Sequence, residues 1–458
     1  MQEFEISGYW YPSDAPYDKK PGTLEFDPLE GLTLEIMGRF RSHTKVSSET
    51  EHRTDIDTIF GQTTSGGDVT LTECSIGKYS LPREYDQKSR GTTQYHPEYC
   101  FAGDHAEDGP KFKSINFRLT NLDQWIHHTD IEDIEFPLDD NTKFSLSYTT
   151  APPNPQMRNF DEDDYRASFF FDDSLDFESI RSDFIKPFQY LITFGLSVPV
   201  FPLRIFGNTQ VDSGRPFGKR FPGSRDIEAF SSIGTSVVFP ESRYRLRHEG
   251  RAHPMWTLAY IEDEVERILQ NWYSVYHKHQ PLFDLFFTSM YYDDDEYPSV
   301  IILNLTRALE AYHRESDRYI NYYIPEKEYK EYREVLENTI PEDFPDQFTD
   351  HLKDGTFKFA NRVSLRKRLK DIIEDQEEVL QYRFGEELDS SAMASEIKEI
   401  RNDLTHLSDE DISEFNVEGT ILYKLRYLIE TVIADEVGFD PEIFPFYRKR
   451  KQAEEEED

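Results

Sequence analysis

The sequence has few cysteines and no long apolar run, and these absences exclude several classes of protein. Only Cys74 and Cys100 occur in 458 residues, which excludes a disulfide-stapled scaffold and a cysteine-rich zinc site. The most apolar window, residues 184–203, is interrupted by Lys186, Gln189 and three prolines, so we expect no membrane span. The first ten residues, MQEFEISGYW, contain neither the basic nor the apolar region of a signal peptide. Together these absences predict a cytoplasmic protein with no membrane partner.

Positive charge is also scarce. The chain has 51 Lys and Arg residues against 89 Asp and Glu residues, a net charge of −38. A surface of this sign repels phosphate backbones, which argues against a protein that coats DNA or RNA but not against a nuclease with a local basic pocket. Such an acid excess is also typical of proteins in concentrated salt, where counterions screen the repulsion, so a halophilic host is one interpretation. Hydrophobic residues make up 37% of the chain, enough for folded cores.

The length and the hydrophobic pattern predict more than one domain. A chain of 458 residues is too long for one compact core. In the first half, apolar residues alternate with polar ones, as at Leu32, Leu34 and Ile36, and Pro-Gly and Gly-Gly pairs recur between such runs. This alternation is typical of strands that are buried on one face. We expect further strands around residues 69–71, 144–148 and 198–206, and a short helix over residues 175–191.

After about residue 252 the apolar residues follow a helical period. From Trp256 onward, Leu258, Ile261, Val265 and Ile268 fall on one helix face. The pattern predicts further helices over residues 298–312, 329–338, 363–380, 392–407 and 420–437. The sequence therefore predicts an α+β protein with a β-rich domain over residues 1–252, an all-α domain over residues 253–447 and a charged tail over residues 448–458.

Several common catalytic motifs are absent. The chain contains no GxxxxGK[ST] phosphate loop, no HExxH, no GxSxG and no GxGxxG. His277 and His279 have no carboxylate at metal-ligand spacing in the sequence. We therefore expect neither a metal nor a cofactor.

One string in the helical half, RNDLTH at residues 401–406, carries side chains suited to phosphodiester chemistry. The bare Arg-x4-His spacing is weak evidence, since a sequence of this composition contains about one such pair by chance. Arg243 and His248 form a second pair in strand-like sequence. Only the helical context separates the two.

That context is an amphipathic helix over residues 392–407. Its apolar stripe is Ile397, Ile400, Leu404 and Leu407. Asn402 and His406 lie on the opposite face, and Arg401 lies on the flank, from which its long side chain reaches towards them. A solvated helix end with a histidine favoured by the helix dipole is the alternative interpretation.

These three side chains suit cleavage of RNA by its own 2′-hydroxyl. Arg401 can clamp a phosphate and stays charged, while His406 titrates near neutrality and can move a proton. Asn402 could orient the histidine or hold a phosphate oxygen. One Arg and one His leave a proton-transfer role unfilled, which a second copy across a two-fold axis would supply.

The RNDLTH helix resembles the Arg-Asn-x3-His signature of the HEPN ribonucleases. Three other strings resemble the Apea-like branch of that superfamily, namely NWYSVYHKHQPLFDLFFTSMY (271–291), LTRALEAYHRE (305–315) and LYKLRYLIETVIADEVGF (422–439). In the first half, GYWYP (8–12), residues 32–40, IFGQTTSGGDVTLTEC (59–74) and FRLTNLDQWI (117–126) resemble the β-rich domain that accompanies this branch. The resemblance covers most of the chain, including its domain order.

The resemblance implies a HEPN bundle that forms a homodimer or higher homo-oligomer through the helical domain. It implies a metal-independent endoribonuclease that cleaves RNA, with transfer RNA as one candidate, and acts as an anti-phage, abortive-infection effector. Arg401, Asn402 and His406 would carry catalysis, and Glu310 would be either a polar partner or a plain surface carboxylate. The N-terminal domain would sense a phage-derived trigger, or restrain the nuclease. The acid-rich stretches depart from the family and leave open how RNA approaches.

Two alternatives remain. The first is a non-catalytic HEPN-type module that binds RNA or nucleotides, or assembles larger complexes. The second is a latent nuclease that is inactive until the N-terminal half releases it.

Local basic residues supply candidate RNA contacts. Arg362, Arg366 and Lys370 recur every four residues along the predicted 363–380 helix, as a phosphate track or as an ordinary solvated face. In the first half, Arg243, Arg245 and Arg247 alternate on a probable strand. They could dock against an acidic domain or contribute to sensing.

Overall fold

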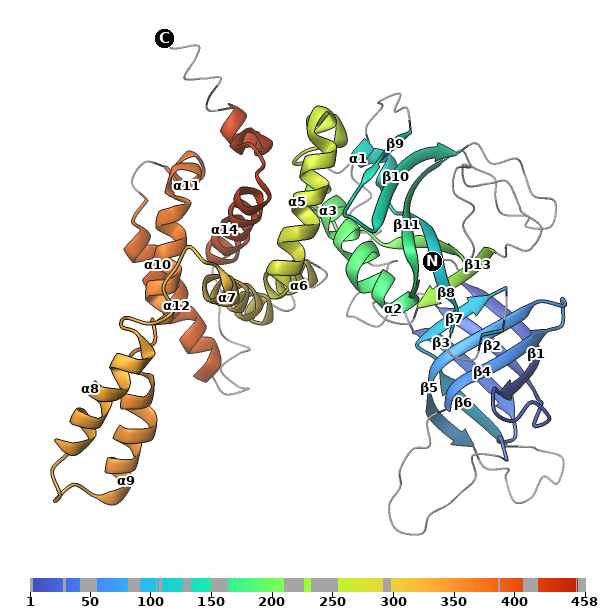
Figure 1. The fold of residues 1–458 in the computed structure, drawn as a ribbon, viewed down its shortest axis with the longest axis horizontal. Helices are drawn as coiled ribbons and strands as arrows, with labels where there is room; N and C mark the ends of the chain where they lie inside the picture. Colours follow the sequence, from blue (N-terminus) through green and yellow to red (C-terminus); the bar gives the residue numbers. More distant parts are fainter. Residues whose placement is uncertain are drawn as a thin grey trace. The chain divides into compact units, whose positions relative to one another are not determined.

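A computed structural model describes most of the chain. The described residues are 3–27, 30–41, 56–80, 91–103, 105–106, 109–126, 133–149, 164–209, 226–231, 254–290, 298–385, 388–406, 419–449 and 451, with the side chains of 79–80, 149, 164, 226–231, 406 and 419 outside this description. The chain divides into two compact units, Met1–Tyr273 and Ser274–Asp458. The first is rich in strands and the second is helical, which confirms the predicted α+β class (Figure 1). The predicted boundary at residue 252 lies outside the described residues and stays a prediction.

The strands of the first unit form one continuous sheet. Their bounds are β1 (Phe4–Pro12), β2 (Lys20–Asp27), β3 (Gly31–Met37), β4 (Ile56–Thr63), β5 (Asp68–Ser80), β6 (Thr92–His96), β7 (Tyr99–Ala102), β8 (Lys111–Leu119), β9 (Ile134–Pro137), β10 (Thr142–Thr149), β11 (Asp164–Asp176), β12 (Pro202–Asn208) and β13 (Asp226–Ser231). The order across the sheet is β4-β1-β2-β3-β6-β5-β7-β13-β12-β8-β11-β10-β9. Because β4 also pairs with β5, the first part of the sheet closes on itself.

Apolar side chains fill the closed part of the sheet. The alternating residues Leu32, Leu34 and Ile36 are buried in β3, as the sequence predicts. Trp10 is fully buried and its ring lies against Gly61 of β4, where a Cβ would come within 2.2 Å of the ring. The absence of a side chain at Gly61 therefore lets the Trp10 indole fit.

Among its described residues, the first unit includes the short helices α1 (Leu122–Ile126), α2 (Phe177–Ile180) and α3 (Lys186–Leu196). Phe188 of α3 packs against Phe117 of β8 and Phe144 of β10. The predicted 175–191 helix contains a π-helical turn over Arg181–Ile185, just before Pro187. Proline has no N–H for the usual α-helical bond, which accounts for the irregular turn.

The strand predicted around residues 198–206 begins only at Pro202. Two side chains of α3 form hydrogen bonds with the backbone just before this strand. Gln189 donates to the Val200 carbonyl at 2.7 Å, and Thr193 accepts from the Val200 N–H at 3.3 Å. With both of its backbone groups bonded to α3, Val200 is not available for sheet pairing.

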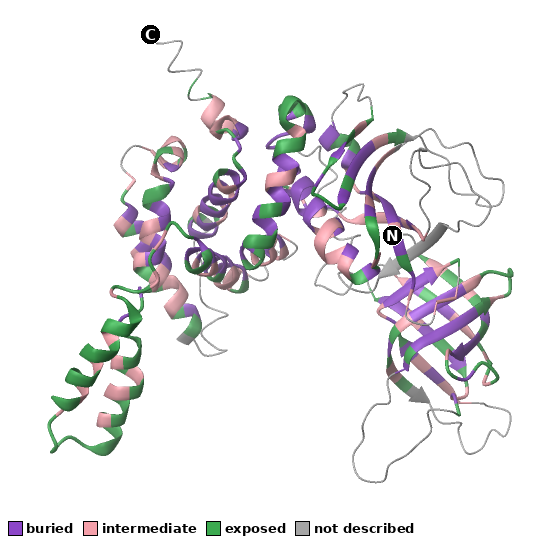
Figure 2. Cartoon of the chain, viewed as in Figure 1, coloured by how far each residue is buried: buried purple, intermediate pink, exposed green. Residues whose placement is uncertain are grey.

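The second unit is a bundle of helices. Their bounds are α5 (Val265–Lys278, which begins in the first unit), α6 (Gln280–Ser289), α7 (Pro298–Glu315), α8 (Glu326–Asn338), α9 (Asp346–Asp350), α10 (Leu365–Asp375), α11 (Glu377–Phe384), α12 (Ser390–His406) and α14 (Gly419–Val437). Leu305 of α7, Leu369 of α10 and Leu428 of α14 are fully buried in its core. By contrast, α8, α9 and the π-helical turn His351–Phe357 contain no buried residue (Figure 2).

The structure revises two predicted helices. The segment 258–264 forms 3-10 turns, so α5 begins at Val265. The predicted 363–380 helix divides at Gln376 into α10 and α11, and the Gln376 amide donates to Asp435 of α14 at 3.2 Å. The Gln376 backbone lies outside the helical region, with φ −101° and ψ 10°, so α10 ends there while its side chain is tied to α14.

Candidate functional site

Helix α12 carries the predicted catalytic string. Met393, Ala394, Ile397 and Leu404 are buried on its inner face. Met393 and Ala394 lie four and three residues before Ile397, and Leu404 lies seven residues after it, which is the apolar stripe of an amphipathic helix. Ile400 is half-buried, and the predicted stripe member Leu407 lies outside the described residues. The apolar face thus fixes the side of α12 on which Arg401 and Asn402 emerge.

Arg401 and Asn402 lie in contact. Both are half-buried, and the Arg401 guanidinium donates from Nη1 to Asn402 Oδ1 at 3.3 Å. The Thr405 hydroxyl donates to the Asn402 carbonyl at 2.8 Å, within the same helical turn. His406 is the last residue of α12, one turn beyond Asn402, and its side chain lies outside the description. The structure therefore brings two of the three predicted residues together.

Two neighbouring helices brace α12. Arg366 of α10 donates from Nε to Ser395 Oγ at 2.7 Å and from Nη2 to Ser391 Oγ at 2.6 Å. Lys424 of α14 forms an ion pair with Glu396 at 2.9 Å. These contacts limit rotation of α12 about its axis, and so they position the Arg401 side of the helix.

The predicted RNA contacts do not share one helical stripe. Arg362 precedes α10, forms an isolated β-bridge with Tyr322, and stacks its guanidinium over the Phe359 ring at 4.8 Å. Lys370 forms an ion pair with Glu374 of its own helix at 3.2 Å. The prediction that Arg362 lies on the same helix as Arg366 and Lys370 is wrong, because α10 begins only at Leu365, after its N-cap Ser364. A role in RNA binding stays a prediction for all three residues.

Other sequence candidates have local partners or lie outside the description. Glu310 forms an ion pair with Arg314 one turn further along α7, at 3.4 Å. Arg243, Arg245, Arg247 and His248 lie outside the described residues.

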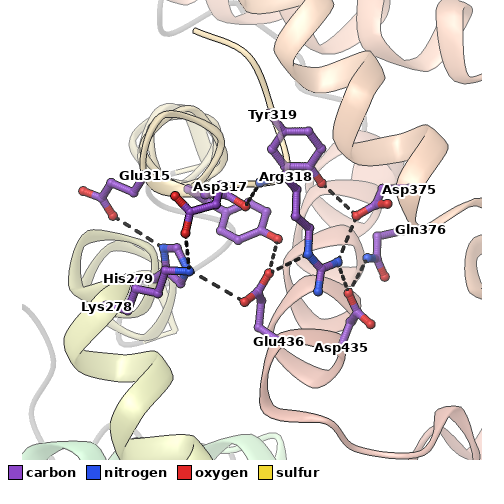
Figure 3. Close-up of polar contacts among 12 residues, drawn as sticks. Lys278, His279, Glu315, Asp317, Arg318, Tyr319, Asp375, Gln376, Asp435 and Glu436 are labelled. Atoms are coloured by element: carbon purple, nitrogen blue, oxygen red, sulfur yellow. Dashed lines mark hydrogen bonds and ion pairs between the residues drawn. The ribbon is translucent and has the colours of Figure 1, made fainter.

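A polar seam joins the ends of several helices in the second unit (Figure 3). Arg318, just after α7, is its centre: its guanidinium forms ion pairs with Asp375 of α10 at 3.0 Å, and with Asp435 at 2.5 Å and Glu436 at 3.2 Å in α14. Tyr312 of α7 donates to Glu436 at 2.7 Å. A guanidinium that serves three carboxylates fixes the relative positions of these helix ends.

His279 lies at one end of this seam (Figure 3). Its ring is fully buried, with Nδ1 3.7 Å from Glu315 Oε2 and Nε2 3.8 Å from Glu436 Oε2. Neither nitrogen has a hydrogen bond at this separation. Burial lowers the pKa of His279 below its ordinary value, although the two carboxylates oppose that shift. Sequence spacing could not reveal this group, because the carboxylates are remote along the chain.

A second buried histidine, His313 of α7, is fully bonded. Its Nε2 lies 3.2 Å from Asp371, and its Nδ1 lies 2.9 Å from the Arg368 guanidinium, which also donates to Asn321 at 2.7 Å. Burial lowers the pKa of His313 as well. This network has a structural role, because it ties α7 to α10.

The described residues contain no group of three or more His, Cys, Asp or Glu side chains that could hold a metal ion. None of the described helices is long and apolar enough to span a bilayer.

Comparison with known families matches both halves of the chain. The profile of the ApeA N-terminal domain 1 matches residues 5–184, and that of the Apea-like HEPN domain matches residues 303–443, which include Arg401, Asn402 and His406. No curated protein and no solved structure matches the chain. HEPN domains are generally nucleases, which indicates a function of the ribonuclease or defence type. On these two matches, in this order along one chain, the protein belongs to the Apea-like HEPN family.

Proposed function

We propose that this protein is a metal-independent endoribonuclease that acts as an anti-phage defence effector, with Arg401, Asn402 and His406 as its catalytic residues. The observation that supports the proposal most is the contact between the Arg401 guanidinium and the Asn402 amide at 3.3 Å, one turn before His406. Arg401 and Asn402 emerge from a helix whose other side is packed and braced, which is the support that a precise site requires.

The proposed reaction uses the RNA as its own nucleophile. The 2′-oxygen attacks the adjacent phosphorus, a 2′-O–P bond forms and the P–O5′ bond breaks. The products are a 2′,3′-cyclic phosphate and a 5′-hydroxyl end. His406 takes the proton of the 2′-hydroxyl or returns one to the 5′-oxygen. Arg401 stabilises the charge that builds up on the phosphate oxygens, and Asn402 orients the guanidinium.

A second copy of the chain completes the proposed site. The reaction needs one group to remove a proton and another to deliver one, and each chain supplies one histidine from this helix. A two-fold axis between two α12 helices would place both motifs around one phosphodiester. RNA and a second copy are thus the proposed partners.

The end groups of the RNA products test the proposal. Purified protein is incubated with transfer RNA in the presence of a chelator. We expect cyclic phosphate and 5′-hydroxyl ends. Arg401→Ala and His406→Ala should each lower the cleavage rate by about 100-fold or more, since each removes a proton-transfer or charge-stabilising group. Glu399→Ala, an exposed change on the same helix, is the matched control and should cleave normally.

Three results would contradict the proposal. Undiminished cleavage by both variants would exclude these residues, and loss of cleavage in chelator would exclude a metal-independent reaction. RNA that remains intact with the wild-type protein under every condition would favour a non-catalytic HEPN module that binds RNA or nucleotides.

A further inference from the structure

Three arginines lie side by side in the sheet of the first unit. Arg204 of β12 is the register partner of Arg118 of β8. On the other side of β8, Ala167 of β11 is opposite Phe117, so Arg166 lies opposite Arg118 one residue further along the same antiparallel register. Residues directly opposite each other in adjacent strands point to the same face. The three side chains therefore form one row across three strands, and all are half-buried.

The face that carries this row is polar and largely covered. Along β8, Asn116 and Ser114 follow Arg118 at intervals of two, and they are only 2% and 1% exposed. Ser168 of β11 is the register partner of Asn116 and is 5% exposed. The intervening residue Phe117 packs with Phe188 on the opposite, apolar side of the sheet. A buried polar face is unusual because each of its groups needs a hydrogen-bond partner.

The charge of Arg166 on this face is unfavourable as it stands. Like charges directly opposite each other destabilise a sheet. Burial lowers the pKa of Arg166, and the positive charges of Arg118 and Arg204 lower it further. Arg166 Nε and Ser114 Oγ are buried with no hydrogen-bond partner, and within the described ranges no carboxylate pairs with Arg166. A protein with 38 excess negative charges thus places three cations together where one lacks a counter-charge.

We infer that this face is a binding site for a small phosphate-bearing ligand, of the pyrophosphate or nucleotide class. An anion of two or more charges would relieve the repulsion in the row and satisfy the buried donors. Guanidinium groups bind phosphate through parallel N–H bonds, and Ser114 and Asn116 add neutral donors. Phe206 of β12 lies beside the row, with its ring 5.3 Å from the Arg204 guanidinium, and offers an apolar surface to a base.

The inference goes beyond RNA cleavage and does not depend on it. The row lies in the first unit, whereas Arg401 and Asn402 lie in the second. Binding is read out without RNA, so failure of either proposal leaves the other standing.

Calorimetric titration and thermal unfolding of the full chain test the inference. The probes are pyrophosphate and ATP, each against sodium chloride of matched ionic strength, because salt alone affects an acidic protein. We expect saturable binding and a rise in Tm. Binding of both probes would identify the phosphate group as the recognised part. Binding of ATP alone would show that the base is also needed for recognition. Both results support the site.

Matched substitutions decide whether the row of arginines is responsible for ligand binding. Arg166→Gln should weaken binding about tenfold or more and should raise the Tm of the unliganded protein, because it removes like-charge repulsion. Arg267→Gln, the same charge change at an exposed position of α5, should alter neither result. Arg204→Gln replaces Arg166→Gln if the latter does not fold. Binding of neither probe, binding of RNA alone, or equal binding by all variants would overturn the inference.

Discussion

Burial and the nearby carboxylates shift the pKa of His279 in opposite directions, and the net shift makes the stability of the fold depend on pH. The fully buried ring lies between Glu315 and Glu436. Burial nevertheless lowers its pKa below the ordinary 6.5, so the folded protein favours the neutral ring. Below pH 6.5 the unfolded chain takes up the proton before the folded protein does. The contribution of His279 to stability is therefore complete above about pH 6.5 and decreases as the pH falls towards the lowered folded pKa.

A substitution at His279 tests the direction of this pH dependence of stability. We expect the Tm of wild type to fall between about pH 7 and pH 5, and His279→Gln to make that fall shallower, because glutamine does not titrate. His277→Gln, two residues earlier and exposed, is the matched control and should leave the slope unchanged. Differential scanning calorimetry at several pH values measures the slopes. A steeper fall in His279→Gln would mean that the carboxylates, and not burial, dominate the pKa.

At the scale of elements, the position of α12 depends on contacts from its neighbours. Arg366 of α10 links to Ser391 and Ser395, and its charged hydrogen bonds are partly exposed to solvent. We expect Arg366→Ala to lower the free energy of unfolding by about 1 kcal/mol, since solvent weakens such bonds. Lys370→Ala, which removes an ion pair within α10, should have a smaller effect. Urea unfolding measures both changes.

Variants of Arg366, Lys370 and the two serines distinguish a role of Arg366 in bracing α12 from a role in RNA binding. If Arg366 acts on α12 alone, Ser391→Ala and Ser395→Ala together should lower stability as much as Arg366→Ala, and the triple variant should lose little more. If Arg366 and Lys370 contact RNA, both single variants should weaken RNA binding in low salt. Additive losses of stability in the triple variant would contradict the bracing role.

At the scale of the whole molecule, the net charge of −38 makes salt a stabilising condition. Charges of one sign repel each other across a folded surface, and ions screen that repulsion. We expect the Tm to rise as potassium chloride increases from about 0.05 M to 1 M, where the screening length falls to roughly 3 Å. Sucrose of equal osmolality controls for general solute effects. A Tm that falls with salt would show that local ion pairs, such as those of Arg318, outweigh the net repulsion.

Much of the fold follows from local patterns. Alternation at Leu32, Leu34 and Ile36 predicts β3, and the three-and-four spacing in α12 predicts its buried face, because a side chain's direction depends on backbone period alone. The breaks do not follow from local patterns. The helix break at Gln376 coincides with its contact to Asp435, and Val200 stays out of the sheet because α3 bonds its backbone. Each of these positions contacts a side chain outside its own element, which a local pattern does not reveal.

The sequence by itself determined the order of a β-rich and a helical domain, the acid excess and the short string from Arg401 to His406, since each depends on residue type and near neighbours. Tertiary structure decided which distant groups meet. Only strand register aligns Arg118, Arg166 and Arg204, and only helix packing places Glu315 and Glu436 around His279. Electrostatic energies depend on separation and burial in space, and neither quantity can be read from positions along a chain.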